Sequence, residues 1–277
     1  MNFEAIITKI ESLPPLSDTT QIVRRLYLDG AQNVDISRLV RAIESDALLT
    51  VNILKMINSP LYGFSKKIAS VSQAVTLFGT QIVFGLVVRY SIGASVMANL
   101  RPYGCSNDTF NDICHMQSNL ISQWYSKIDI RHAQFLAPLA LIMESGKLIL
   151  AKEITASGNI KNFSHDLMES DSISQYENSI FGTSSYYVSG ILFEHWNLEP
   201  LYVDILKGLD FIHKPSSKLS HYIDSLDVVR TVVNVKNIFT KESIDEASDI
   251  VSDMDLNVDH FRVSVRKIQT IYLKKIK

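Results

Sequence analysis

The side chains that could do chemistry in this sequence are its histidines, its acids and its two cysteines. The seven histidines form no HxH, HxxxH or HExxH pattern, although a metal site needs several converging nitrogen, oxygen or sulfur ligands. His165 and Asp166 form one His-Asp pair, but the surrounding stretch, FSHDLMESDS, is polar and acidic. We therefore expect a solvated helix start there. Cys105 and Cys114 are too few for a structural zinc site without histidines, and we interpret them as ordinary thiols.

Motifs for nucleotide and hydrolase chemistry are also missing. The sequence has no GxxxxGK[ST] loop and no GxSxG turn. Gly79 and Gly85 do not make a dinucleotide-binding fingerprint, because no strand precedes them. The sequence thus predicts no metal, no cofactor and no catalytic residue.

Composition excludes several classes of protein. Of the 277 residues, 46% are hydrophobic and 20% are charged, which is typical of a folded globular protein and not of a disordered chain. The net charge of −2 disfavours nucleic-acid binding through a bulk positive field. The N-terminus does not resemble a signal peptide, and two cysteines suit a reducing compartment. The most apolar segment, residues 82–98, contains Arg89 and falls short of ~20 clean apolar residues, so we expect a buried helix in a cytoplasmic protein without membrane contact.

The elements that must position any site are helices almost throughout. One clear helical repeat consists of Ile36, Leu39, Val40 and Ile43. Asp35 and Asp46 stand where helix caps are expected, Ser70 opens a capping box, and Gly79 ends that short helix. Alternating strand patterns are poor, and the β-branched run 228–235 lies in a longer amphipathic stretch, so we interpret it as helix. The fold class predicted is all-α.

The clearest break in the chain is the stretch RPYGCSND at residues 101–108. It predicts two packed helical bundles, one formed by residues 1–105 and one by residues 106–277. The second bundle includes a C-terminal helical extension.

Four short motifs in order resemble the HDOD family, the HD-related output domain of bacterial signalling proteins. They are LPPLS at residues 13–17, IESDALLT at 43–50, LKMINSPLYG at 54–63 and IASVSQAVTLFG at 68–79. Each is weak alone, but four in register are a strong signal. A weaker continuation extends the resemblance over residues 13–210.

The second half is similar in plan to the HD phosphohydrolase fold, but its metal ligands are replaced. The stretch LIMESGKL looks like the helix LLHDIGKL, which places Met143 and Glu144 at the His-Asp pair. A further histidine position falls at Ser185, and the usual paired histidines fall near Leu209 and Asp210. A thioether, a hydroxyl and a leucine cannot hold a divalent ion. The resemblance therefore implies a degenerate HD-like bundle without phosphohydrolase chemistry.

The resemblance implies a non-catalytic bacterial signal-transduction regulator. Such a protein would bind a signalling partner, or a nucleotide or other small ligand, in two-component, cyclic-dinucleotide, motility or biofilm control. We expect the binding site in the groove between the two bundles, with Asn58, Ser59, Tyr62 and Lys66 near it.

Two alternatives remain open. The first is a metal-dependent HD-type phosphohydrolase or phosphodiesterase with the atypical ligands His115, Glu144 and Asp210. The second is a helix-turn-helix nucleic-acid binder formed by residues 36–56. Its second helix offers Lys55 as its one basic residue, which disfavours it because recognition helices contact the groove through polar and basic side chains.

Overall fold

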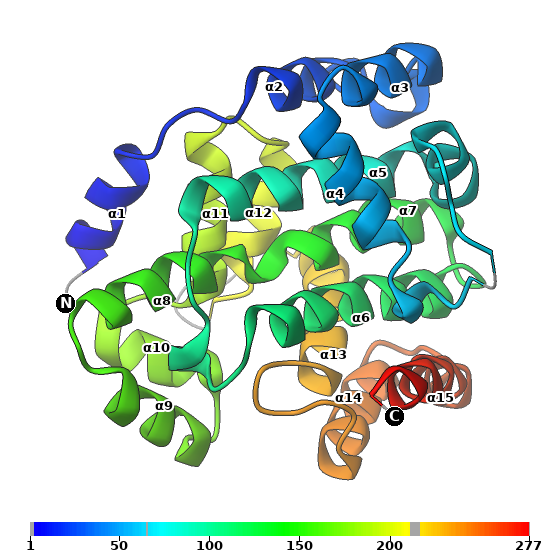
Figure 1. Cartoon of the computed structure of the whole chain (residues 1–277). Helices are drawn as coiled ribbons and strands as arrows, with labels where there is room; N and C mark the ends of the chain where they lie inside the picture. The colour runs from blue at the N-terminus through cyan, green and yellow to red at the C-terminus, as the bar shows by residue number, and fades with distance from the viewer. Residues whose placement is uncertain (1–2, 65, 211–216, 277) are drawn as a thin grey trace.

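The computed structural model describes residues 3–64, 66–210 and 217–276, and α-helices joined by short links make up that part of the chain (Figure 1). The one pairing of extended backbone within the described residues is an antiparallel bridge between Val233 and Ile238. The all-α fold class is confirmed, and the β-branched run 228–235 is helical as far as Val232.

The helices of the first half are α1 (Phe3–Glu11), α2 (Asp18–Arg25), α3 (Ile36–Glu44), α4 (Ala47–Ile57) and α5 (Val71–Val96). Those of the middle are α6 (Asn107–Tyr125), α7 (Ile130–Ile142), α8 (Gly146–Ala156), α9 (Ile160–Glu169) and α10 (Ile173–Phe181). The last are α11 (Ser185–His195), α12 (Pro200–Gly208), α13 (Ser220–Val232), α14 (Lys241–Asp253) and α15 (Val258–Lys275). Four 3₁₀ turns join them: η1 (Ala31–Asn33), η2 (Pro60–Tyr62), η3 (Arg101–Tyr103) and η4 (Met143–Ser145).

Local chemistry sets the helix ends where the sequence predicts them. The carboxylate of Asp35 accepts from the Arg38 amide at 3.0 Å, and that of Asp46 accepts from the Leu49 amide at 2.9 Å. The Ser70 hydroxyl caps the start of α5. Gly79 has a φ of +79°, so the helical path breaks there and α5 is kinked.

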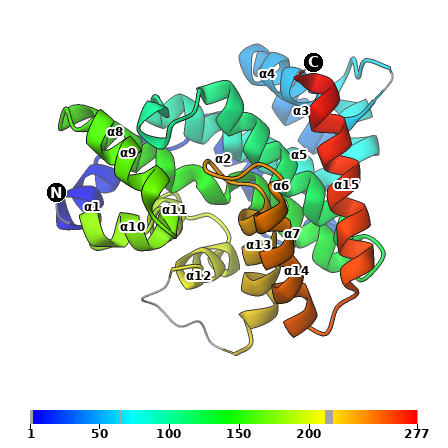
Figure 2. The ribbon, with the colours of Figure 1, turned by 90° about the horizontal axis from the view of Figure 1, so that it is seen from below.

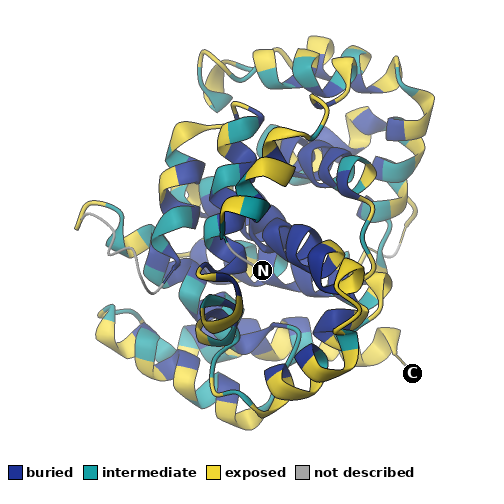
Figure 3. Ribbon diagram, turned by 90° about the vertical axis from the view of Figure 1, so that its left-hand side faces the viewer, coloured by how far each residue is buried: buried dark blue, intermediate teal, exposed yellow. Residues whose placement is uncertain are grey.

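The middle of the molecule is a layer formed by α5, α6 and α7, with α8 continuing the direction of α7 (Figure 1). α11 packs on both α8 and α12, and α13 and α15 pack against α6 (Figure 2). Buried residues concentrate along these central helices, whereas the outer helices show exposed faces (Figure 3). One hydrophobic core runs through both predicted bundles, and the boundary between residues 105 and 106 stays a prediction.

Two helical stretches are long and apolar enough to cross a membrane by length and composition, namely Val71–Val96 and Ile130–Ala156. Half of the apolar window in the first, and 89% of that in the second, is buried inside the protein. Burial against other helices accounts for their composition, which is compatible with a soluble protein.

α8 and α11 approach each other closely at Gly146, the first residue of α8. A Cβ atom there would lie 1.9 Å from the Ser185 carbonyl oxygen. The Gly146 amide donates to the Ser189 hydroxyl at 2.7 Å. Only glycine lets α8 reach α11 this closely, and this approach places Lys147 beside Ser185.

Gly146→Ala is therefore expected to destabilise the protein by roughly 1–3 kcal/mol, the usual cost of forcing extra volume into a packed interior. Gly93→Ala is the matched control, because a Cβ at Gly93 meets nothing within 4 Å and alanine favours a helix interior. Urea unfolding followed by circular dichroism measures both. Equal stability of the two variants would contradict the proposed close packing.

Candidate functional site

Charged side chains that are inaccessible to solvent form a buried ionic network where η4, α8, α10 and α11 meet. The network consists of Glu144, Lys147 and Glu177 with their hydrogen-bond partners. The Lys147 ammonium lies 2.6 Å from a Glu144 oxygen, and both side chains are at most 1% exposed. The ammonium also donates to the Ser185 hydroxyl at 2.9 Å.

Glu144 is held in its charged form by its neighbours. Burial raises its pKa, but the Lys147 ammonium and hydrogen bonds to the carboxylate outweigh burial and bring the pKa below its usual value. Gln117 donates to the carboxylate at 2.8 Å, and the Tyr186 hydroxyl donates at 3.0 Å. For Lys147, burial lowers the pKa, but Glu144, with smaller contributions from Tyr186 and Glu177, more than compensates and raises it. The two residues therefore form a true ion pair at neutral pH.

Glu177 completes the network from α10. Its carboxylate accepts from the Ser185 amide at 2.6 Å and from the Tyr103 hydroxyl at 2.8 Å. Burial raises its pKa, and the nearby Lys147 only partly opposes this effect. The single ammonium is thus committed mainly to Glu144, and Glu177 retains a proton to higher pH than an ordinary glutamate.

The Tyr186 ring lies against two cations. The Lys147 nitrogen is 4.5 Å from the ring centroid, and the Arg230 guanidinium carbon is 4.4 Å from it. Arg230 is itself fixed by Asp227 and by the Leu209 carbonyl oxygen. Cation–π contacts of this kind gain strength away from water, so the ring helps to stabilise the two buried cations.

The residues at the positions that the resemblance assigns to metal ligands all make other contacts in the fold. Met143 and Leu209 are core side chains, Glu144 pairs with Lys147, and Ser185 accepts from it. Asp210 accepts from the Ser184 amide at 3.2 Å and from the Ser184 hydroxyl at 3.0 Å, at the start of α11. No group of three or more His, Cys, Asp or Glu side chains that could hold a metal ion occurs in the described part of the chain.

His115 does not join this network. Its Nδ1 lies 2.8 Å from the Tyr62 hydroxyl. Burial, with smaller contributions from Arg89 and Lys275, lowers the pKa of His115 to about 3, so the ring is neutral at pH 7. The three atypical ligands of the enzyme alternative, His115, Glu144 and Asp210, thus have separate partners.

The four residues predicted near a binding groove are mostly engaged in the fold. The Asn58 side chain bonds both the amide and the carbonyl of Ile68 at 2.8 Å, which closes the loop after α4. Ser59 caps η2, and Tyr62 contacts His115. Lys66 is exposed. Their role in ligand or partner binding stays a prediction.

Several other expectations are met. His165 and Asp166 are exposed as expected, but they lie in the middle of α9 and not at its start, because the helix begins at Ile160. Both cysteines are free thiols.

Sequence reasoning missed four network members, namely Tyr103, Gln117, Glu177 and Tyr186. Nothing in their local patterns separates them from ordinary helix residues. A lysine within the apolar run GKLILA is the one signal that a buried counter-charge exists.

Glu144→Gln is expected to cost about 3–5 kcal/mol of unfolding free energy at pH 7, because it leaves the Lys147 ammonium buried without its partner. Glu177→Gln is the matched control and should cost less, since it removes a charge that burial already disfavours. Chemical denaturation at pH 7 gives both values. A double variant, Glu144→Gln with Lys147→Met, should cost less than the sum of its single changes; additive costs would contradict the ion pair.

The same pair predicts how stability depends on pH. The pKa of Glu144 is depressed in the folded state, so its contribution is present above the ordinary glutamate pKa and is lost as the pH falls through the folded value. Denaturation curves between pH 7 and pH 3 should show wild-type stability falling more steeply than that of Glu144→Gln. Parallel curves would show that Glu144 carries no such linkage.

Comparison with known proteins indicates the family of this chain. The HDOD domain model matches residues 13–209. No curated protein matches the chain.

Solved structures share the fold at low identity. A Shewanella amazonensis protein whose name suggests a phosphohydrolase has a TM-score of 0.72 and 13% identity, over 98% of this chain and 96% of that one. A Marinobacter aquaeolei protein whose name suggests signal transduction has a TM-score of 0.71 and 18% identity, over 98% of this chain and 64% of that one. An HDOD protein of unknown function from Geobacter sulfurreducens has a TM-score of 0.59 and 16% identity, over 96% and 98%. The match over residues 13–209, supported by this shared fold, means that the chain belongs to the HDOD family.

Proposed function

We propose that this chain is a non-catalytic regulator of bacterial signal transduction that works in the cytoplasm by binding a partner protein or a small ligand. The observation that carries the proposal is the ion pair between Lys147 and Glu144. Glu144 stands at an acid position of the HD-like site, and the ammonium of Lys147 already neutralises it. The ammonium of Lys147 thus neutralises the charge of Glu144, which a metal ion would otherwise do.

The inaccessibility of these side chains to a substrate supports the same conclusion. Hydrolysis by metal-activated water needs an open coordination position and a path for the substrate. The side chains of Glu144 and Lys147 are sealed from solvent. A phosphate ester would have to displace packed helices to reach them.

The buried charges have their partners within the protein in this arrangement. The charges are satisfied by Ser185, Gln117 and Tyr186, and the surrounding core is apolar. A scaffold that keeps its shape without chemistry is suited to recognition, and the signal-transduction name of the Marinobacter aquaeolei neighbour agrees with that role. The phosphohydrolase name of the Shewanella amazonensis neighbour makes hydrolysis the alternative that an experiment must test.

Purified protein incubated with Mn²⁺, Fe²⁺ or Zn²⁺ and then desalted is expected to retain no stoichiometric metal, and to release no product from bis-p-nitrophenyl phosphate. The reason is that the acid at the HD-like site is paired with Lys147 and sealed from solvent, so it is not available to bind a metal ion beside a substrate. Elemental analysis and absorbance of nitrophenolate measure the two outcomes. One bound metal per chain, with hydrolysis that Glu144→Gln abolishes, would overturn the regulator proposal; hydrolysis unchanged in that variant would indicate a contaminant.

A further inference from the structure

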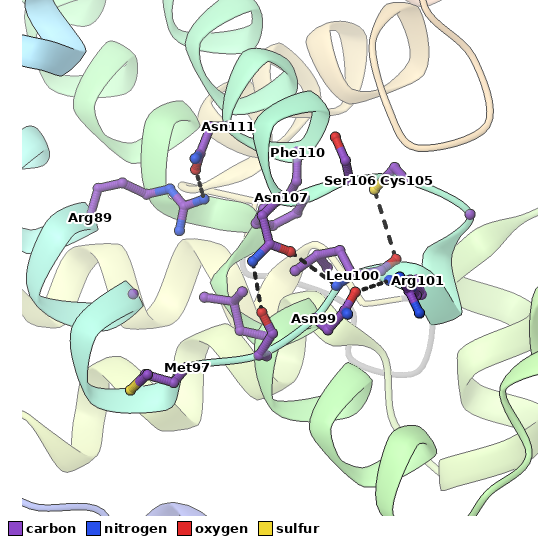
Figure 4. A pocket seen from close by; sticks show the side chains of 14 residues that line it. Arg89, Met97, Asn99, Leu100, Arg101, Cys105, Ser106, Asn107, Phe110 and Asn111 are labelled. Atoms are coloured by element: carbon purple, nitrogen blue, oxygen red, sulfur yellow. Dashed lines mark hydrogen bonds between the residues drawn. The ribbon is translucent and has the colours of Figure 1, made fainter.

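A pocket of about 990 Å³ lies where the end of α5, the link through η3 and the first turns of α6 come together (Figure 4). Its size is at the upper end of the range for small-molecule sites. It is separate from the buried ionic network, although Leu148 of α8 reaches its wall.

Arg89 is the most unusual residue of this pocket. It is 6% exposed, and none of the described acidic residues forms a salt bridge with it. Its guanidinium donates to the Asn111 side-chain oxygen at 2.8 Å and lies 5.0 Å from the Phe110 ring centroid (Figure 4). Arginine stays protonated in proteins and buried charges are normally paired, so this arginine lacks a counter-charge.

The rest of the lining does not supply that charge. The pocket contains a second arginine, Arg101, and no Asp or Glu. Burial raises the pKa of the neighbouring Cys114 thiol to about 11, so this group is neutral. Another pocket of the fold differs, because it pairs Arg131 with Asp129. The lining of the Arg89 pocket therefore carries two arginines and no acidic residue.

The walls are already built to receive a ligand. The Asn107 side chain accepts from the Leu100 amide at 3.1 Å and donates to the Ala98 carbonyl at 3.0 Å, which fixes the link against α6. The N-terminus of α6, a helix of 19 residues, adds its partial positive charge at Ser106 and Asn107. Apolar surface completes the site, with Met97 81% exposed at the rim.

We propose that this pocket binds a small molecule with a phosphate or carboxylate group on an apolar or aromatic body, and that Arg89 contacts the anionic group. The planar guanidinium matches both oxyanions, while Phe110, Leu148 and Met97 contact the body. This inference rests on the proposed function and deepens it, because it names the chemical class of small molecule that the regulator would bind as its signal. Binding at Arg89 can be measured whether or not the chain is catalytic.

The test is titration calorimetry at constant ionic strength with pyrophosphate, adenosine monophosphate and citrate as probes. Arg89→Gln removes the cation, and Arg38→Gln, which changes an exposed arginine on α3, is its control. Gly93→Leu places a bulky side chain in the pocket one helical turn after Arg89 and leaves the arginine itself unchanged, because Gly93 lines the pocket and a Cβ there meets nothing within 4 Å. Gly93→Ala is the control for that change.

Wild type and both controls are expected to bind at least one probe saturably. Arg89→Gln should weaken binding about tenfold or more, which is the loss expected for a charged hydrogen bond of ~1.5 kcal/mol or above, and Gly93→Leu should abolish it. Preference for the phosphate probes or for citrate identifies the oxyanion. The proposal is overturned if wild type binds none of the probes, or if Gly93→Leu binds a probe as tightly as wild type does. The Gly93→Leu result tests the proposal even if Arg89→Gln fails to fold. Phosphate released from bound adenosine monophosphate would instead defeat the non-catalytic function and leave the site intact.

Discussion

The pairing of Lys147 with Glu144 is the interaction on which the second half of the fold depends. Removing an ammonium and a carboxylate from water costs several kcal/mol per ion, so these two charges are tolerable only with complete partners. Those partners come from different elements: Gln117 from α6, and Ser185 and Tyr186 from α11. The helices must therefore pack in this one arrangement, because any other arrangement leaves a buried charge without a partner in the apolar core.

This constraint also decides which groups the buried carboxylates contact. A catalytic carboxylate must be free to meet a metal, a proton or a substrate, whereas Glu144 is fully occupied by the groups that stabilise the fold. Glu177 is similarly engaged by Ser185 and Tyr103. The acids of the network are therefore engaged by groups of the fold itself, and a pocket such as the one at Arg89 is the more accessible place for a ligand.

Local features were predictable from the sequence, and non-local ones were not. Asp35, Asp46 and Gly79 act within their own turns, so residue type and spacing are enough to predict them. The ionic network joins residues as distant as Tyr103 and Glu177, 74 positions apart, and no local pattern encodes that pairing. The break between α7 and α8 at η4 is likewise non-local, because it coincides with the close approach of α8 to α11 at Gly146. Arg89 was correctly expected in a buried helix, but its missing counter-charge is visible only once the neighbouring helices are in place.

The ionic network and the Arg89 pocket are connected through shared elements. The turn η3 contributes Arg101 to the pocket, and its Tyr103 donates to Glu177 of the network. On α8, Leu148 lines the pocket directly after Lys147. Regulation requires a coupling free energy between two sites, and a short turn that touches both is a physical route for it. A ligand drawn to Arg89 would contact η3 on one side, while the buried charges hold η3 on the other.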